Sequence, residues 1–316
     1  MTEPPAGQLS VSVAASTSNL GPGFDMLGLA LSIPLQVEAR ITDGPVSVYA
    51  DREGEARTWP SPPHEILIEA YQRVGRELGV ELPALALSVR SEIPIGRGLG
   101  SSGAAITAGL LLGEHLARRA TADACDRDPN RTFLVQLGAE LEGHPDNSTA
   151  SLLGGMTLAV PHAEGIRVLR PELSPVLGFS VAWPASPLPT QLGRDALPDV
   201  VPLSDAIENP RRLALLLEGL RTADPGLVTL GAHDRLHERF RLPLIRGGAE
   251  ALAAAREAGA YAAMISGSGS ALIAISARDD RAAIADAMRE PLERADGPAH
   301  ARPVEVMHEA PRVAES

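Results

Sequence analysis

The chain has 316 residues, 44% of them hydrophobic, which is enough for two domains of ordinary size with their own cores. Its formal net charge is −12 and only 3% of its residues are aromatic, which argues against a nucleic-acid-binding protein, since such proteins normally show a basic face or a row of stacking aromatic rings. All 28 basic residues are arginine, which excludes Schiff-base chemistry and any phosphate loop that needs a lysine.

The same composition favours small-molecule chemistry in the cytoplasm. No signal peptide is recognisable and no apolar run is as long as a membrane span, so we expect no membrane contact. The one cysteine, Cys125, has no partner for an internal disulfide and no metal-ligand neighbour. We expect a small-molecule substrate and no nucleic acid as partner, and a homodimer is one assembly compatible with the sequence.

The first predicted strand, residues 9–13, runs into a polar stretch over residues 15–25 that contains Asn19, two glycines and Asp25. Polar side chains on a tight loop can converge on a ligand, although composition alone favours an ordinary turn. Residues 35–49 alternate as a strand, residues 51–63 are predicted to be a polar loop, and a helix is expected over residues 64–78.

The most informative stretch is the glycine-rich turn PIGRGLGSSG at residues 94–103, between a strand predicted over residues 85–93 and a helix predicted over residues 104–119. Its glycines let the backbone approach a ligand closely, and Ser101 and Ser102 offer hydroxyls for the helix N-cap. The unpaired N–H groups of the first helical turn favour an anion, most often phosphate.

A dinucleotide-binding loop does not explain this turn. Residues 98–103 match G-x-G-x-x-G formally, but residues 94–97 separate them from the strand. The region about 20 residues further on is polar and turn-like, so no acidic residue closes a second strand there. We therefore expect a phosphate site of another kind.

A helix predicted over residues 131–142 ends at Glu142 and leads into the turn EGHPDN at residues 142–147. A carboxylate in this position suits a magnesium ion, which prefers one or two carboxylates together with phosphate oxygens. A solvated Glu142 and a His144 that caps the turn are an equally simple interpretation. We place a domain boundary after residue 162, which gives domains 1–162 and 163–316.

In the second half, a strand predicted over residues 179–183 stops at Pro184, and a loop leads to Thr190 and Arg194. On its own, an arginine at such a junction is more often a surface charge. Helices are expected over residues 209–221 and 249–257, and a glycine turn flanked by apolar strands over residues 259–275. The remainder should give one helix, a short strand and a frayed tail.

The glycine-rich turn with its leading proline resembles the phosphate-binding signature P-x-x-x-G-L-G-S-S of the GHMP kinases, with Gly103 where alanine is commoner. Residues 15–25, 142–156, 190–194 and 233–241 resemble segments of the homoserine kinases within that family, and residues 259–275 resemble the third GHMP motif. One departure is Ile66, which stands where an asparagine usually helps to hold the adenine.

This resemblance covers nearly the whole chain and implies a fold and an activity. The fold is α+β, with two domains: an N-terminal domain like domain 2 of ribosomal protein S5 and a ferredoxin-like C-terminal domain, with the active site between them. The implied reaction uses ATP and Mg²⁺ to phosphorylate the side-chain hydroxyl of L-homoserine to O-phospho-L-homoserine, for threonine biosynthesis. Two alternatives are a GHMP kinase for another small alcohol, such as mevalonate or shikimate, and a non-catalytic family member that binds an amino acid.

The resemblance also assigns roles to residues. Nucleotide binding is implied for Pro94, Ile95, Gly96, Arg97, Gly98, Leu99, Gly100, Ser101, Ser102, Gly103 and Ala104. Substrate binding is implied for Asn19, Asp25, His144, Thr190, Arg194 and Arg241. The metal would be held by Ser101 and Glu142, and the catalytic set is Ser101, Glu142, Asp146 and Asn147. Asp146 is the candidate general base; the alternative is that Asn147 stands in the place of a catalytic aspartate, as the resemblance to homoserine kinases implies.

Overall fold

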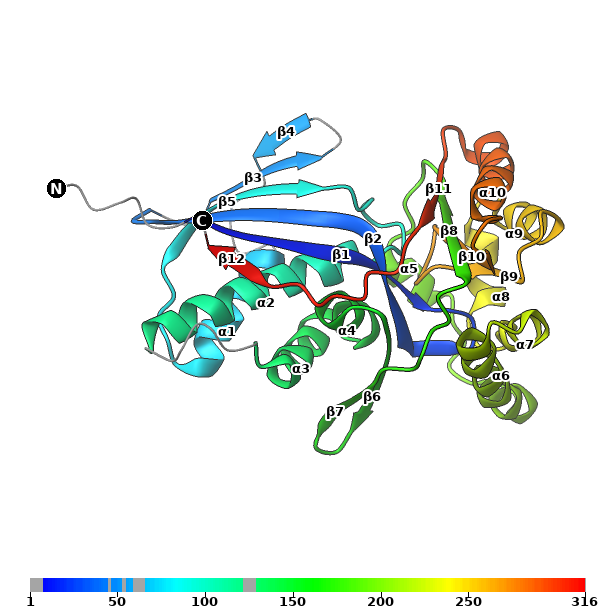
Figure 1. Cartoon of the computed structure of the whole chain (residues 1–316), viewed down its shortest axis with the longest axis horizontal. Helices are drawn as coiled ribbons and strands as arrows, with labels where there is room; N and C mark the ends of the chain where they lie inside the picture. Colours follow the sequence, from blue (N-terminus) through cyan, green and yellow to red (C-terminus); the bar gives the residue numbers. More distant parts are fainter. Residues whose placement is uncertain (1–7, 45–46, 53–54, 59–65, 122–128, 316) are drawn as a thin grey trace.

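The computed structural model describes residues 8–44, 47–52, 55–58, 66–121 and 129–315, and places two sheets toward opposite ends of an elongated molecule (Figure 1). Cys125 and the start of the helix expected from residue 64 lie outside the described residues. Within the described part of the chain, none of the helices combines the length and the apolar character that crossing a membrane requires.

The large sheet has eight strands, in the order β12-β1-β2-β5-β3-β4, with β6 paired to β2 and β7 to β6. The strands are β1 (Leu9–Asn19), β2 (Gly23–Thr42), β3 (Ser47–Arg52), β4 (Glu55–Thr58), β5 (Ala84–Ser91), β6 (Met156–His162), β7 (Gly165–Leu169) and β12 (Val313–Glu315). Residues 9–13 of β1 alternate between buried and exposed, as the sequence predicts, because one face of the sheet is open there. Residues 15–19 are buried whichever way they point.

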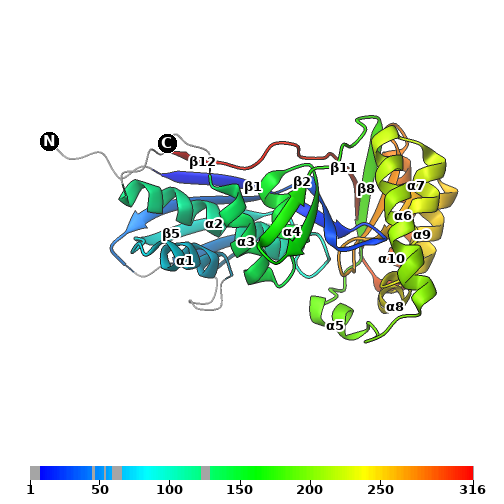
Figure 2. The ribbon, with the colours of Figure 1, turned by 90° about the horizontal axis from the view of Figure 1, so that it is seen from below.

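Four helices cover one face of this sheet: α1 (Ile66–Leu78), α2 (Ser101–Ala120), α3 (Arg131–Glu142) and α4 (Asp146–Leu153) (Figure 2). Helix α2 is buried along most of its length, because its small residues let α1 approach closely. A Cβ atom on Gly109 would lie 2.1 Å from the carbonyl oxygen of Leu67. The glycine-rich turn thus leads into a helix that is buried along most of its length.

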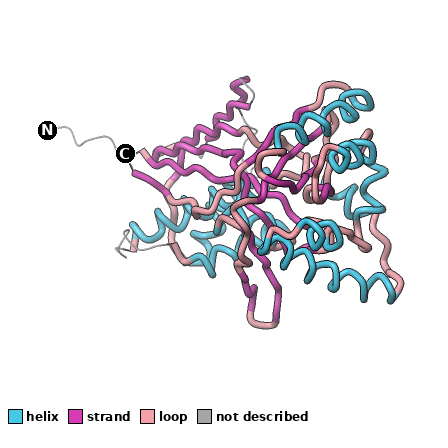
Figure 3. Tube along the Cα trace, turned by 45° about the vertical axis from the view of Figure 1, so that its right-hand side comes forward, coloured by secondary structure: helices cyan, strands magenta, loops and turns pink. Residues whose placement is uncertain are grey.

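The second sheet has the antiparallel order β11-β8-β10-β9. Its strands are β8 (Leu177–Trp183), β9 (Ala262–Ile265), β10 (Leu272–Ala277) and β11 (His300–Val304). The helices of this half are α5 (Thr190–Asp195), α6 (Leu203–Thr222), α7 (Pro225–Gly231), α8 (Glu238–Arg241), the 3₁₀ helix η1 (Leu242–Leu244), α9 (Gly248–Glu257) and α10 (Arg281–Asp296). In the three-dimensional trace, the strands of this half lie toward the middle of the molecule and most of its helices lie on the outside (Figure 3).

Several local expectations are wrong. Strand β1 continues to Asn19, so most of the polar stretch at residues 15–25 belongs to β1 and β2 rather than to a loop. The polar loop expected at residues 51–63 includes the end of β3 and all of β4. The turn at residues 142–147 leads directly into α4, a helix that was not expected from the sequence. The domain boundary placed after residue 162 stays a proposal, and it lies in the turn between β6 and β7.

The C-terminal segment is not a frayed tail. Beyond β11 the chain returns to the large sheet, where the amide of Met307 donates to Ala30 and its carbonyl accepts from Gly155. Strand β12 then pairs antiparallel with β1, with Val313 opposite Val11. The last residues described therefore cover the edge of the first sheet, beside its first strand (Figure 1).

Candidate active site

A cleft of about 350 Å³ lies where the two halves of the molecule meet. It is lined by the end of β1, the glycine-rich turn and the α3–α4 turn from the first half, and by α5, α8 and residues 267–268 from the second. Seventeen of the predicted site residues line it; Leu99, Gly103 and Ala104 do not, because they are buried under the turn. The cleft also includes Ser18 and Ser268, which lie inside the recognised motifs but were not singled out.

The glycines of the turn are needed for its own packing as well as for access. Gly96, Gly98 and Gly100 have φ values of +64°, +73° and +69°, a region that other residues rarely adopt. A Cβ atom on Gly98 would lie 2.2 Å from the carbonyl oxygen of Ser266, and one on Gly100 would lie 2.0 Å from the Oγ atom of Ser16. At these two positions, the space that a side chain would take is filled by the protein itself.

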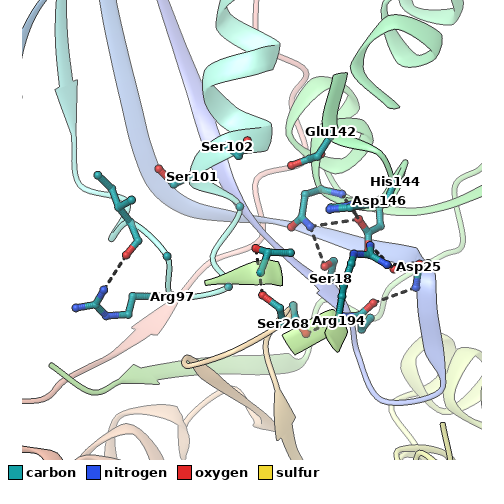
Figure 4. A pocket seen from close by; sticks show the side chains of 18 of the residues that line it. Ser18, Asp25, Arg97, Ser101, Ser102, Glu142, His144, Asp146, Arg194 and Ser268 are labelled. Atoms are coloured by element: carbon teal, nitrogen blue, oxygen red, sulfur yellow. Dashed lines mark hydrogen bonds and ion pairs between the residues drawn. The ribbon is translucent and has the colours of Figure 1, made fainter. Parts of the chain in front are cut away.

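The two serines that follow begin α2 and do not cap it. The N-cap is Gly100, in a left-handed conformation and with no side-chain cap, so the expectation that a serine hydroxyl caps this helix is wrong. The hydroxyls of Ser101 and Ser102 take part in none of the hydrogen bonds among the described residues. Both side chains line the cleft (Figure 4), so these hydroxyls and the first-turn N–H groups are placed to meet an anion.

Across the cleft from this turn, Glu142 lies at the end of α3, where Gly143 ends the helix with φ +81°. Its Oε2 atom accepts a hydrogen bond from the amide of Ser148, at 3.0 Å, in the first turn of α4. Burial raises the pKa of Glu142 to about 7, and the charge of Asp146 adds to this while that of His144 opposes it. Because the ionised form of Glu142 is unfavourable in this buried position, a bound cation would stabilise it.

Three neighbouring side chains of the α3–α4 turn form a hydrogen-bonded cluster. The Nδ1 atom of His144 lies 2.6 Å from Oδ1 of Asp146, and the same oxygen accepts from the amide of Asn147 at 2.8 Å. Burial alone would lower the pKa of His144, but the hydrogen bond and charge of Asp146 raise it above its usual value. Asn147 is tied to β1, since its Oδ1 accepts from Ser16 and its Nδ2 donates to Ser18.

Asp25 and Arg194, which belong to different halves of the molecule, form an ion pair across the cleft (Figure 4). The two terminal nitrogens of Arg194 donate to the two carboxylate oxygens of Asp25, at 3.0 and 3.1 Å. Both side chains are about one-third exposed, at 37% and 33%. The pair is therefore reachable by a ligand and can be exchanged for contacts with one.

Arg241 also lines the cleft, and it is almost fully buried, with 2% of its surface exposed. Its Nε atom donates to the carbonyl of Gly193 at 3.0 Å, and its guanidinium lies 5.0 Å from the centre of the Phe24 ring. Burial, and then the charge of Arg194, lower its pKa. His237, which was not predicted as a site residue, stacks on the same Phe24 ring, with the ring centres 5.0 Å apart.

The other predicted substrate residues are held by the loop at residues 266–269. Asn19 donates from Nδ2 to the carbonyl of Gly267, at 2.7 Å, and accepts from the amide of Asp25. Thr190 accepts from the Ser268 hydroxyl at 3.4 Å. Asn19 therefore lines the cleft and also holds the backbone of Asp25 through a hydrogen bond to its amide.

Family models match both halves of the chain: the GHMP kinases N terminal domain over residues 65–155 and the GHMP kinases C terminal over residues 216–294. A homoserine kinase from Synechococcus sp. is 40% identical over 300 residues, covering 93% of this chain and 92% of that protein. A homoserine kinase from Prochlorococcus marinus is 39% identical over 313 residues, covering 96% and 95%.

Among solved structures, the homoserine kinase from Cytophaga hutchinsonii superposes with a TM-score of 0.85 at 24% identity and covers 99% of each chain. A mevalonate kinase superposes with a TM-score of 0.66 at 11% identity, covering 95% of this chain and 99% of the other. These likenesses and the family models confirm the predicted α+β, two-domain fold. The chain belongs to the GHMP kinase family, and its relatives at about 40% identity over nearly its whole length are homoserine kinases.

Proposed function

We infer that this chain is a homoserine kinase, which phosphorylates the side-chain hydroxyl of L-homoserine with ATP and Mg²⁺ and yields O-phospho-L-homoserine for threonine biosynthesis. The observation that carries this inference is the near full-length relation to homoserine kinases at about 40% identity. The cleft supports it, because it is lined by the glycine-rich turn from one side and by Asp25, Arg194 and Arg241 from the other. Mevalonate and shikimate have no ammonium group that the Asp25 carboxylate could bind.

The residues of the cleft fit a magnesium nucleotide. The described residues hold no cluster of three or more acidic, histidine or cysteine side chains that could bind a metal alone. Magnesium, however, often takes one or two carboxylates and completes its shell with phosphate oxygens and water. We propose Glu142 and Ser101 as its protein ligands, and the ion would neutralise charge on the phosphates. The phosphates themselves would be bound by residues 94–104, through the turn and the N-terminus of α2.

We propose that the amino-acid end of homoserine exchanges with the Asp25–Arg194 pair. The ammonium group would take the place of Arg194 beside Asp25, and the carboxylate would be bound by Arg194 and Arg241. Thr190 and His144 would hold the rest of the substrate from either side. A ligand with both charges can replace both halves of the ion pair, whereas a ligand with one charge leaves a partner unpaired.

Positioning and charge neutralisation should supply most of the rate, as in phosphoryl transfer generally. Asp146 is our candidate for the group that accepts the hydroxyl proton, held in place by His144 and Asn147. Asn147 in turn is fixed to β1 by Ser16 and Ser18. The cluster therefore links the reacting side of the cleft to the strand that carries Asn19.

The test is an ADP-release assay with a panel of small alcohols that includes L-homoserine, L-serine, mevalonate and shikimate. We expect L-homoserine to have the highest kcat/KM, with phosphorus NMR identifying O-phospho-L-homoserine as the product. A higher kcat/KM with another alcohol would redirect the assignment to that substrate. Homoserine binding without ADP release would favour an amino-acid-binding protein instead.

We also place the enzyme in the cytoplasm, and sedimentation would show whether it is a homodimer.

A further inference from the structure

The arginine of the glycine-rich turn joins the two halves of the cleft. Its Nε atom donates to the carbonyl of Pro184 at 3.1 Å, and its Nη2 atom donates to the carbonyl of Ala185. The remaining nitrogen, Nη1, donates back to Ile95 within the turn, at 2.7 Å. Figure 4 shows the Arg97 side chain directed away from Glu142. The guanidinium therefore grips the backbone of the second half of the molecule instead of facing the acidic side of the cleft.

The segment that Arg97 grips leads into the proposed substrate side of the site. Residues 184–188 follow β8, and helix α5, with Thr190 and Arg194, begins immediately after Pro189. A backbone contact supports the grip, since the amide of Leu188 donates to the carbonyl of Gly96 at 2.8 Å. The turn that would bind phosphates and the segment that would bind homoserine are thus joined at adjacent residues.

The backbone of the turn is held without the Arg97 side chain. The carbonyl of Arg97 accepts from the amide of Ala271 at 2.7 Å, and the carbonyl of Gly98 accepts from the Ser266 hydroxyl at 2.7 Å. The close packing of Gly98 and Gly100 described above adds to these contacts. Loss of the side chain should therefore leave the turn in place and loosen only its connection to residues 184–188.

We propose that Arg97 is a positioning residue that sets the phosphate-binding turn against residues 184–194, so that nucleotide bound at the turn orders Thr190 and Arg194. The proposal rests on the proposed function, because it concerns the alignment of phosphoryl donor and acceptor. An error of about 1 Å in such an alignment can cost on the order of 10²-fold in rate. The planar fork of arginine suits this role, since its N–H groups reach several carbonyls at once.

The first part of the test needs no acceptor substrate. Hydrogen exchange is measured by mass spectrometry, with and without MgATP, on the wild type, Arg97→Ala, Arg97→Lys and Arg302→Ala. Arg302 is the matched control, because it also connects the two halves, donating to Glu92 at 3.4 Å, but among the described residues its side chain has no hydrogen bond to residues 184–194. We expect nucleotide to slow exchange in residues 188–194 by about five-fold or more in the wild type and Arg302→Ala. Arg97→Ala should lose this response and keep protection of residues 98–104.

The second part measures kinetics and binding. In Arg97→Ala we expect kcat with homoserine to fall about ten-fold, while the Kd for ATP measured without homoserine stays within about three-fold. Added guanidinium ion should restore part of kcat in Arg97→Ala and not raise it in the wild type, and Arg97→Lys should be intermediate. Unfolding temperature is recorded for each variant, so that a loss of folded protein is recognised.

Two results would overturn the proposal. An ATP affinity that falls in step with kcat would make Arg97 a phosphate ligand, and a nucleotide response of residues 188–194 that persists in Arg97→Ala would show that another contact carries it. A wild-type protein that shows the exchange response but leaves homoserine unphosphorylated would contradict the proposed function and leave the role of Arg97 intact.

Discussion

Replacing Arg194 by alanine would remove the guanidinium that holds both carboxylate oxygens of Asp25, at 3.0 and 3.1 Å. The pair is about one-third exposed, so its contribution to folding stability should be about 1 kcal/mol or less. The unfolding temperature should therefore change little. The main effect should appear in substrate binding, because the proposed partner of this arginine is the carboxylate of homoserine.

The size of that effect follows from what binding exchanges. In the free protein Arg194 already has a charged partner, so homoserine replaces one ion pair by two and the gain is less than that of two new pairs. A lost charge-assisted contact of this kind costs on the order of 2 kcal/mol, which corresponds to a rise of about 30-fold in KM for homoserine. The KM for ATP should stay within a few-fold, since the hydrogen bonds of the Arg194 side chain go to Asp25 and none goes to the glycine-rich turn among the described residues.

The assay is steady-state ADP release with homoserine and with its methyl ester, which lacks the carboxylate charge. The ester should be a poorer substrate of the wild type, and Arg194→Ala should discriminate little between ester and acid. Arg239→Ala is the matched control, because Arg239 is ion-paired with Asp205 at 2.9 Å and does not line the cleft. Arg241→Ala should show the same loss with lower stability, since it leaves the buried Gly193 carbonyl unpaired.

A KM for homoserine that is unchanged in Arg194→Ala would refute this reasoning. So would an ester that separates wild type from variant as strongly as homoserine does. In either case these arginines would not bind the substrate carboxylate, and loop amides would be the remaining donors in the cleft.

Three further predictions concern the metal, the turn and pH. Glu142→Gln should lower kcat by about 10²-fold with little change in homoserine KM, because the metal acts on phosphoryl charge; a kcat equal to the wild type at saturating magnesium would contradict the assignment. Gly100→Val should abolish ATP binding measured by titration, since its Cβ would lie 2.0 Å from a hydroxyl oxygen, whereas Gly79→Val, at φ +65° with nothing within 4 Å, should cost stability alone. Burial raises the pKa of Glu238 to about 8, above its value of 4.5 when unfolded, so the folded state holds the extra proton and stability falls as pH rises between these values. Glu238→Gln should remove this slope and raise stability at pH 8 by on the order of 4 kcal/mol, measured by urea unfolding; a variant with the wild-type slope would show that Glu238 is not responsible.

The sequence by itself was sufficient for the elements whose information is local. The helix at residues 131–142, the helix at residues 249–257 and the strand before the glycine-rich turn were predicted within a residue or two, because each has its own apolar period. The turn was also recognised, since a proline, three glycines and two serines in fixed order constrain the backbone wherever the turn is placed. Family membership followed from such motifs and is confirmed by the relatives.

Only the tertiary structure decided how these pieces meet. Residues 15–19 read as a polar loop because their side chains are small and hydroxylated, yet they form a strand whose polar groups bond to Asn147 and to the loop at residues 266–269. The last strand pairs with the first, across nearly the full length of the chain. Such contacts leave little trace in local periodicity, because the partner that makes a polar strand stable lies far away in sequence.

The same reason explains the two contacts that matter most for function. Arg194 and Asp25 are 169 residues apart, and the partners of Arg97 in the second half lie 87 and 88 residues away. The sequence identified which of these residues carry charge and suggested that Asp25 and Arg194 act on one ligand. The pairing of Asp25 with Arg194 and the hydrogen bonds of Arg97 to backbone carbonyls depend on how the two sheets dock. Docking is set by packing that spans the whole chain.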